Sequence, residues 1–91
     1  MKMFSLNVPK NQKSISLNVD GSIFVVSVNK FNGITKVTAR NKYGDHYKVT
    51  AEAKNPQYLV MRYEQLELFI GFYEDGGWSL TVSHIEDPFW G

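Results

Sequence analysis

Side chains that could act as acids, bases or metal ligands near neutral pH are scarce in this sequence. It has two histidines, His46 and His84, and no cysteine. His84 and Glu86 lie two residues apart, so on a strand they would share one face, but two ligands alone do not make a metal site. The sequence has no nucleophile elbow, phosphate-binding loop or paired-histidine motif. We therefore expect a protein that is not an enzyme and that uses no metal or cofactor.

Basic residues are the sharpest positive feature, and they gather between Ile34 and Ala53. The alternation of polar and apolar residues in this stretch predicts a β-hairpin with one basic face. The residues of this face, with the tyrosine expected at its tip, are Lys36, Arg40, Lys42, Tyr43, His46 and Lys48. Cations displace counterions from nucleic-acid phosphates, and an aromatic ring can stack on a base. The alternative is an ordinary solvated sheet face, because lysine keeps a sheet soluble and discourages edge pairing.

Aromatic residues form a second candidate surface in the last third of the sequence. Its residues are Tyr58, Phe69, Tyr73, Phe89 and Trp90. Aromatic side chains that lie outside a strand core are typical of protein interfaces, because they bury a large area with few rotatable bonds. The alternative for Phe89 and Trp90 is that they fold back and close an open end of the domain. Carbohydrate binding through Tyr58, Tyr73 and Trp78 is a further alternative, with no motif behind it.

The elements that must position these residues are short antiparallel strands joined by tight turns. Asp20-Gly21 and Asn32-Gly33 favour two-residue turns of type I′, because these residue types accept a positive φ. With these turns and a three-residue loop at 43–45, the strands from 14 to 54 take one consistent register. That register predicts a core face that includes Val37, Ala39, Val49 and Ala51, and a surface that includes Lys36, Arg40 and Lys48.

The stretch after Pro56 allows two structures. Residues 58–63 and 66–73 can form strands joined at Glu64-Gln65, which pairs Arg62 with Glu67. The alternative is a short helix at 56–66, with Pro56 at its first position. The β-branched and aromatic content favours strands. A three-residue loop at 75–77 then predicts that Phe72 pairs with Leu80.

The fold class that follows is all-β. We expect residues 1–91 to form a single domain, an antiparallel meander of seven or eight short strands folded as a small sandwich or flattened barrel. The sequence has 91 residues, of which 43% are hydrophobic, enough for one core. No apolar run is long enough for a signal peptide or a membrane span, so we expect a cytoplasmic protein with no membrane partner.

The absent catalytic inventory and the surface aromatics together favour a small binding module. We expect it to act through protein–protein contact, either as a homo-oligomer or by binding and inhibiting a partner protein. Nucleic-acid binding through the basic hairpin face is the alternative, and carbohydrate binding through surface aromatics is the third. The charge is uneven along the chain, with a balance of +7 over residues 1–62 and −6 over residues 63–91. This asymmetry either makes the domain an electrostatic dipole or cancels where the two parts interleave.

Overall fold

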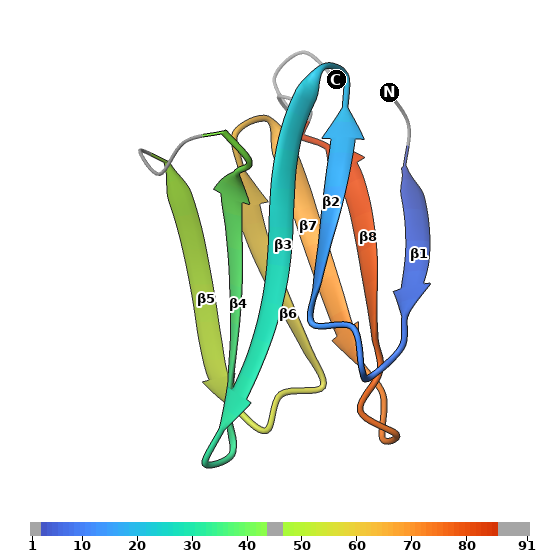
Figure 1. The fold of residues 1–91 in the computed structure, drawn as a ribbon, viewed down its shortest axis with the longest axis vertical. Coiled ribbons are helices and arrows are strands. Elements are labelled where there is room, and N and C mark those ends of the chain that lie inside the picture. The colour runs from blue at the N-terminus through green and yellow to red at the C-terminus, as the bar shows by residue number, and fades with distance from the viewer. Residues whose placement is uncertain (1–2, 44–46, 86–91) are drawn as a thin grey trace.

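The computed structural model describes residues 3–43 and 47–85, which form eight antiparallel strands in two four-stranded sheets (Figure 1). Sheet A has the order β1-β8-β7-β6, with bounds Phe4–Val8, Trp78–His84, Leu66–Phe72 and Tyr58–Tyr63. Sheet B has the order β2-β3-β4-β5, with bounds Ser14–Val19, Ser22–Phe31, Ile34–Asn41 and Lys48–Lys54. The all-β prediction is confirmed, and the arrangement is a small sandwich.

The tight turns of sheet B have the predicted backbone. Asp20 and Gly21 have φ values of 52° and 85°, and Asn32 and Gly33 have values of 53° and 80°. Positive φ at both positions is what a type I′ turn requires. The predicted register follows, because Val26 lies opposite Ala39 and Ala39 lies opposite Val49.

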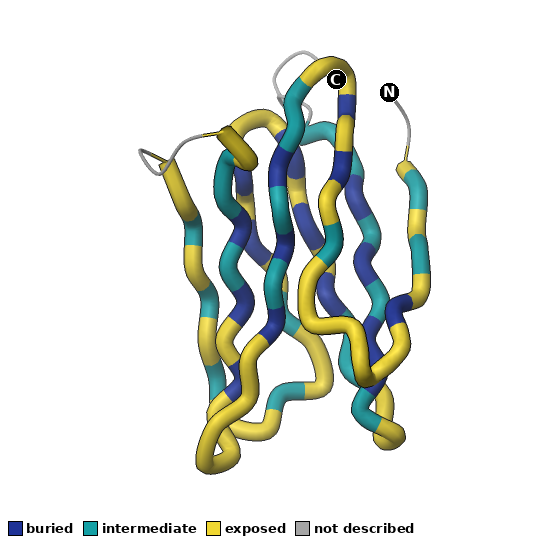
Figure 2. The backbone as a smooth tube through the Cα atoms, viewed as in Figure 1, coloured by how far each residue is buried: buried dark blue, intermediate teal, exposed yellow. Residues whose placement is uncertain are grey.

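The core lies between the two sheets and takes one side chain in two along most strands (Figure 2). Val37 and Ala39 are fully buried, as predicted, whereas Val49 and Ala51 are half-buried. They lie on β5, an edge strand, where one side lacks a neighbour. The largest fully buried side chains are Tyr63, Phe24, Leu68, Ile70, Leu80, Val26, Val37 and Val82.

The stretch at 56–66 contains strand β6 and not the alternative helix. Arg62 lies opposite Glu67, as predicted. Glu64 takes a positive φ of 55° in the turn to β7, a conformation that costs a non-glycine residue some strain. Among the described residues there is no helix long and apolar enough to cross a lipid bilayer.

The predicted register between β7 and β8 is wrong by two residues. Phe72 lies opposite Trp78 and not opposite Leu80. The left-handed residue of the loop is Gly76, with a φ of 95°, so the loop is 74–76. Gly77 instead allows a close approach, because a Cβ there would lie 3.0 Å from the carbonyl oxygen of Val8. A shift of two residues leaves every side chain on its predicted face.

Candidate functional site

The outer face of sheet A carries exposed apolar side chains. Two of them lie on β6, one lies on β7, and one follows the end of β7. We call Tyr58, Val60, Phe69 and Tyr73 the aromatic face. Each has an exposed fraction between 41% and 52%. Val60 lies directly opposite Phe69, and the rings of Tyr58 and Phe69 lie 5.1 Å apart. The structure therefore brings together Tyr58 and Phe69, and it places Tyr73 just beyond β7 on the same outer side.

Next to Phe69 the aromatic face has a glycine, with small polar residues at its side. Gly71 lies opposite Tyr58 on one neighbouring strand and opposite Ser79 on the other. A Cβ at Gly71 would lie 2.9 Å from the hydroxyl oxygen of Ser79, so no larger residue fits there without a shift. Tyr73 donates a hydrogen bond of 2.8 Å from its hydroxyl to the Asn7 amide oxygen, which holds its ring near β1.

The charged residues beside the aromatic face are one cation and one anion. Arg62 and Glu67 are direct cross-strand neighbours on the same outer side of β6 and β7. The surface formed by these two strands therefore alternates between unlike pairs, with a large residue opposite glycine, valine opposite phenylalanine, and a cation opposite an anion.

The basic face lies on the outer side of sheet B, as predicted for Lys36, Arg40 and Lys48. Lys36 lies opposite Glu52, which lowers the local positive charge, whereas Arg40 lies opposite Lys48. At the end of this hairpin, beyond β4, the ammonium nitrogen of Lys42 lies 5.9 Å from the ring centroid of Tyr43. Tyr43 is 78% exposed.

Several predicted site residues cannot be placed on either surface. His46, Glu86, Phe89 and Trp90 lie outside the described residues, so their predicted roles remain predictions. Trp78, named for carbohydrate stacking, is 2% exposed and packs in the core, so it offers no ring to a sugar.

Two exposed apolar residues at the β3–β4 turn are not among the predicted site residues. Phe31 and Ile34 lie opposite each other on the outer side of sheet B, beyond the last lysine of the basic face. Both continue the outward phase of their strands, so the same alternation that placed Lys36 could have placed them.

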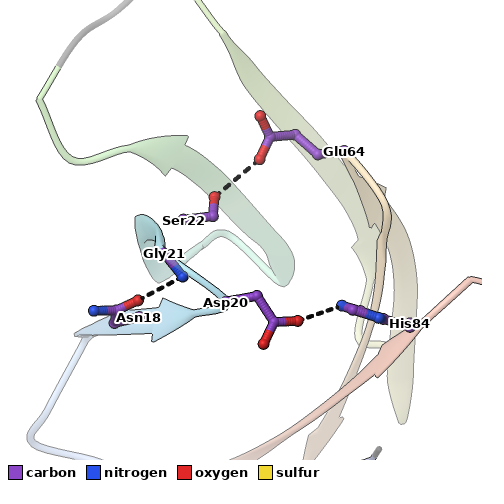
Figure 3. Close-up of polar contacts among 6 residues, drawn as sticks. All are labelled: Asn18, Asp20, Gly21, Ser22, Glu64 and His84. Atoms are coloured by element: carbon purple, nitrogen blue, oxygen red, sulfur yellow. Dashed lines mark hydrogen bonds and ion pairs between the residues drawn. The ribbon is translucent and has the colours of Figure 1, made fainter. Parts of the chain in front are cut away.

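A cavity of about 630 Å³ lies where the β2–β3 turn of sheet B meets the end of sheet A. Figure 3 shows the polar contacts of four residues that line it, Asp20, Ser22, Glu64 and His84. His84 Nε2 and Asp20 Oδ2 lie 2.8 Å apart, and the Ser22 hydroxyl donates to Glu64 Oε1 at 3.0 Å. These two contacts join the sheets at this end. Ser22 contacts a carboxylate and not the imidazole, so the pairs do not form a nucleophile activated by a base. In residues 3–43 and 47–85, no three potential metal ligands cluster together.

Tyr63 is a core residue with a polar atom that finds no hydrogen-bond partner. Its ring stacks on Phe24, with centroids 4.8 Å apart, and its hydroxyl is buried without a partner among the described residues. Burial raises the pKa of Tyr63 above its usual 10.0, and the charges of Glu64 and Tyr47 act in the same direction. The phenol is therefore uncharged at neutral pH, and it contributes to packing and not to acid–base chemistry.

No protein-family model, curated protein or solved structure matches this chain.

Proposed function

We propose that this domain is a non-enzymatic, cytoplasmic protein-binding module that forms a homodimer through its aromatic face. The observation that carries the proposal is a cluster of three apolar side chains, each about half exposed, on the outer side of β6 and β7. Val60 lies opposite Phe69, and the Tyr58 ring lies 5.1 Å from the Phe69 ring. Contiguous exposed apolar patches are uncommon on monomers and mark interaction sites. Tyrosine and phenylalanine are also the residue types that interfaces favour.

The pattern of this surface is complementary to itself. In a dimer with a twofold axis parallel to the strands and midway between β6 and β7, each residue meets its own cross-strand neighbour from the second copy. Tyr58 would then lie over Gly71, and Val60 over Phe69. Such isologous contacts are the rule in twofold dimers, where one patch serves both subunits.

The charged pair fits the same axis. Arg62 of one copy would lie against Glu67 of the second copy, and the reverse contact would form at the symmetry-related position. Opposite charges at the rim of an interface help to fix its register. The second copy is therefore the partner that the surface fits, and an unrelated partner would have to offer a small residue to Tyr58 and the same order of charges to Arg62 and Glu67.

A single introduced cysteine tests this arrangement cleanly, because the native sequence has none. In the proposed dimer the two copies of Val60→Cys lie close together across the axis. A short bismaleimide is therefore expected to convert most of this variant to a covalent dimer, measured by denaturing electrophoresis. The matched control is Thr50→Cys, on the exposed outer side of β5 in sheet B. Equal crosslinking of both variants, or none of Val60→Cys, would show that this face is not the interface.

Nucleic-acid binding is a second candidate function, and one observation favours it. Arg40 and Lys48 are direct cross-strand neighbours, and like charges in that position destabilise a sheet. A phosphate backbone laid across them would neutralise both. Substituting both residues by glutamate is expected to abolish retention on a single-stranded oligonucleotide column at low salt. The slope of the logarithm of the binding constant against the logarithm of the salt concentration is expected to fall in magnitude by about two. The control is Ser5→Glu, on the exposed outer side of β1 in sheet A. A native protein that passes through the column at low salt would exclude this function.

A further inference from the structure

A small cavity at the open end of the sandwich is surrounded by lysines. It lies between the β1–β2 loop, the end of β3 and the β7–β8 turn, at the lower end of the molecule in Figure 1. Its volume is about 230 Å³, and its lining includes Lys10, Lys13 and Lys30. These three residues come from two separate segments of the chain, so the fold brings them together.

Two of these lysines continue the rows of side chains that build the core. The Val28 amide donates to the Lys13 carbonyl oxygen at 2.8 Å, which sets the two residues opposite each other. Lys30 follows Val28 by two positions on β3 and therefore points to the same side of the sheet. The inward rows thus end in cations, where an apolar residue would have extended the core.

The third lysine is held in place by contacts of the β1–β2 loop with sheet A. The Trp78 indole N–H donates to the Gln12 carbonyl oxygen at 3.0 Å. A Cβ at Gly76 would lie 3.1 Å from Lys10 Cβ, so the loop packs directly on the glycine of the β7–β8 turn. The backbone around the cavity is therefore fixed, although the lysine side chains end in solvent.

Within the described part of the chain, no ion pair neutralises these lysines. The one close contact between a basic and an acidic side chain within residues 3–43 and 47–85 joins His84 and Asp20, at the opposite end of the molecule. The nearest carboxylates by sequence lie in the β7–β8 turn, where Asp75 accepts a hydrogen bond of 2.8 Å from the Gly77 amide. Glu74 lines the adjacent cavity that shares Lys30. The Lys30 ammonium nitrogen lies 5.7 Å from the ring centroid of Phe72, so its one described partner is an aromatic ring and not an anion.

We propose that this cavity binds a tetrahedral oxyanion, such as the phosphate or sulfate of a monoester. Ammonium groups are strong donors to such oxygens, and three of them can surround one anion from different directions. The cavity volume accommodates the anion with a small organic group attached. This site is separate from the aromatic face, so it gives the domain a ligand in addition to its protein partner.

The experiment is a titration of the isotope-labelled full chain with sodium phosphate, followed by amide and indole NMR signals. The expected result is a saturable shift of the Trp78 indole and Gly76 amide signals, with no such shift in sodium chloride of equal ionic strength. The double variant Lys13→Gln with Lys30→Gln is expected to bind phosphate about tenfold or more weakly, because each lost contact is a charge-assisted hydrogen bond. Lys54→Gln, at the end of β5 and outside the lining of this cavity, is the control and is expected to bind as the native chain does.

Two further probes distinguish the source of the oxyanion. Glycerol phosphate represents a soluble ester, and phosphatidylcholine vesicles containing phosphatidic acid represent a lipid headgroup. Loss of binding to either probe in the Lys13 and Lys30 variant supports the oxyanion cavity and identifies the source. Shifts that follow ionic strength alone, or equal affinity in the native chain and this variant, would overturn the proposal. The amide spectrum of each variant shows directly that it is folded.

Discussion

Replacing Phe69 with glutamate is expected to convert the protein from a dimer to a monomer. Phe69 lies at the centre of the aromatic face, opposite Val60 and beside the Tyr58 ring. In a twofold dimer each subunit would bury one such carboxylate, and each would face Val60 and not a positive charge. Each central interface residue contributes roughly 2 kcal/mol or more to the free energy of binding. The dimer carries the substitution once in each subunit, so its dissociation constant should rise by about a thousandfold. Analytical ultracentrifugation measures this dissociation constant.

The control for Phe69→Glu must add the same charge elsewhere on a sheet. Thr50→Glu does so on the exposed outer side of β5, and it is expected to leave the dissociation constant unchanged. The Phe69 side chain is partly exposed, so its loss should change the stability of the monomer by less than about 1 kcal/mol. A dimer that survives Phe69→Glu, or one that both variants weaken equally, would contradict the proposed interface.

Replacing Phe24 with alanine is expected to remove a large part of the free energy of unfolding. Phe24 is fully buried in sheet B, and its ring stacks on Tyr63 of sheet A with centroids 4.8 Å apart. Truncation of a buried phenylalanine costs ~3–5 kcal/mol, because it removes apolar contacts and leaves a cavity. The total free energy of unfolding of a small domain is only ~5–15 kcal/mol. Urea unfolding followed by tryptophan fluorescence measures the loss.

Two variants keep the Phe24 prediction testable if alanine prevents folding. Phe24→Leu leaves a smaller cavity and is expected to cost ~1–2 kcal/mol. Val25→Ala lies next in the chain on the outer side of β3, where the side chain is half-buried. It should cost less than about 1 kcal/mol. Similar losses for Phe24→Leu and Val25→Ala would mean that this position is not at the centre of the core.

Sheet B is predictable from the sequence because the information that specifies it is local. Asp20 and Asn32 each precede a glycine, and each dipeptide sets both the turn type and the register of its two strands. Once the register is set, alternation decides the faces, so Val37 and Lys36 could be placed correctly on opposite sides. The same reasoning placed Tyr58 and Phe69 outside the core of sheet A.

The β7–β8 register is not predictable in this way, because two adjacent glycines leave the position of the turn open. Gly76 takes the left-handed conformation, and Gly77 makes a close contact with Val8. That contact exists only because β1, from the other end of the chain, pairs with β8. No local pattern signals this pairing, since Leu6 and Leu80 are alternating apolar residues like many others.

The candidate sites also differ in whether local sequence patterns or contacts between distant segments build them. The aromatic face depends on alternation within two neighbouring strands, so the sequence shows it. The Asp20–His84 contact joins a turn of sheet B to the last strand of sheet A, and the lysine cavity joins the β1–β2 loop to the β7–β8 turn. Both sites require the packing of one sheet on the other. The inward phase of Lys13 and Lys30 was the only part of the cavity that the sequence pattern contained.

The most direct test of the proposed homodimer is the molar mass of the unmodified protein in solution as a function of concentration. Sedimentation equilibrium, run from low micromolar to near-millimolar protein, is expected to show a reversible rise from the mass of one chain, 10.4 kDa, to twice that mass. The Phe69→Glu variant should remain at the mass of one chain over the same range. A native protein that stays monomeric throughout, or one that continues to grow beyond two chains, would contradict a closed dimer formed through the aromatic face.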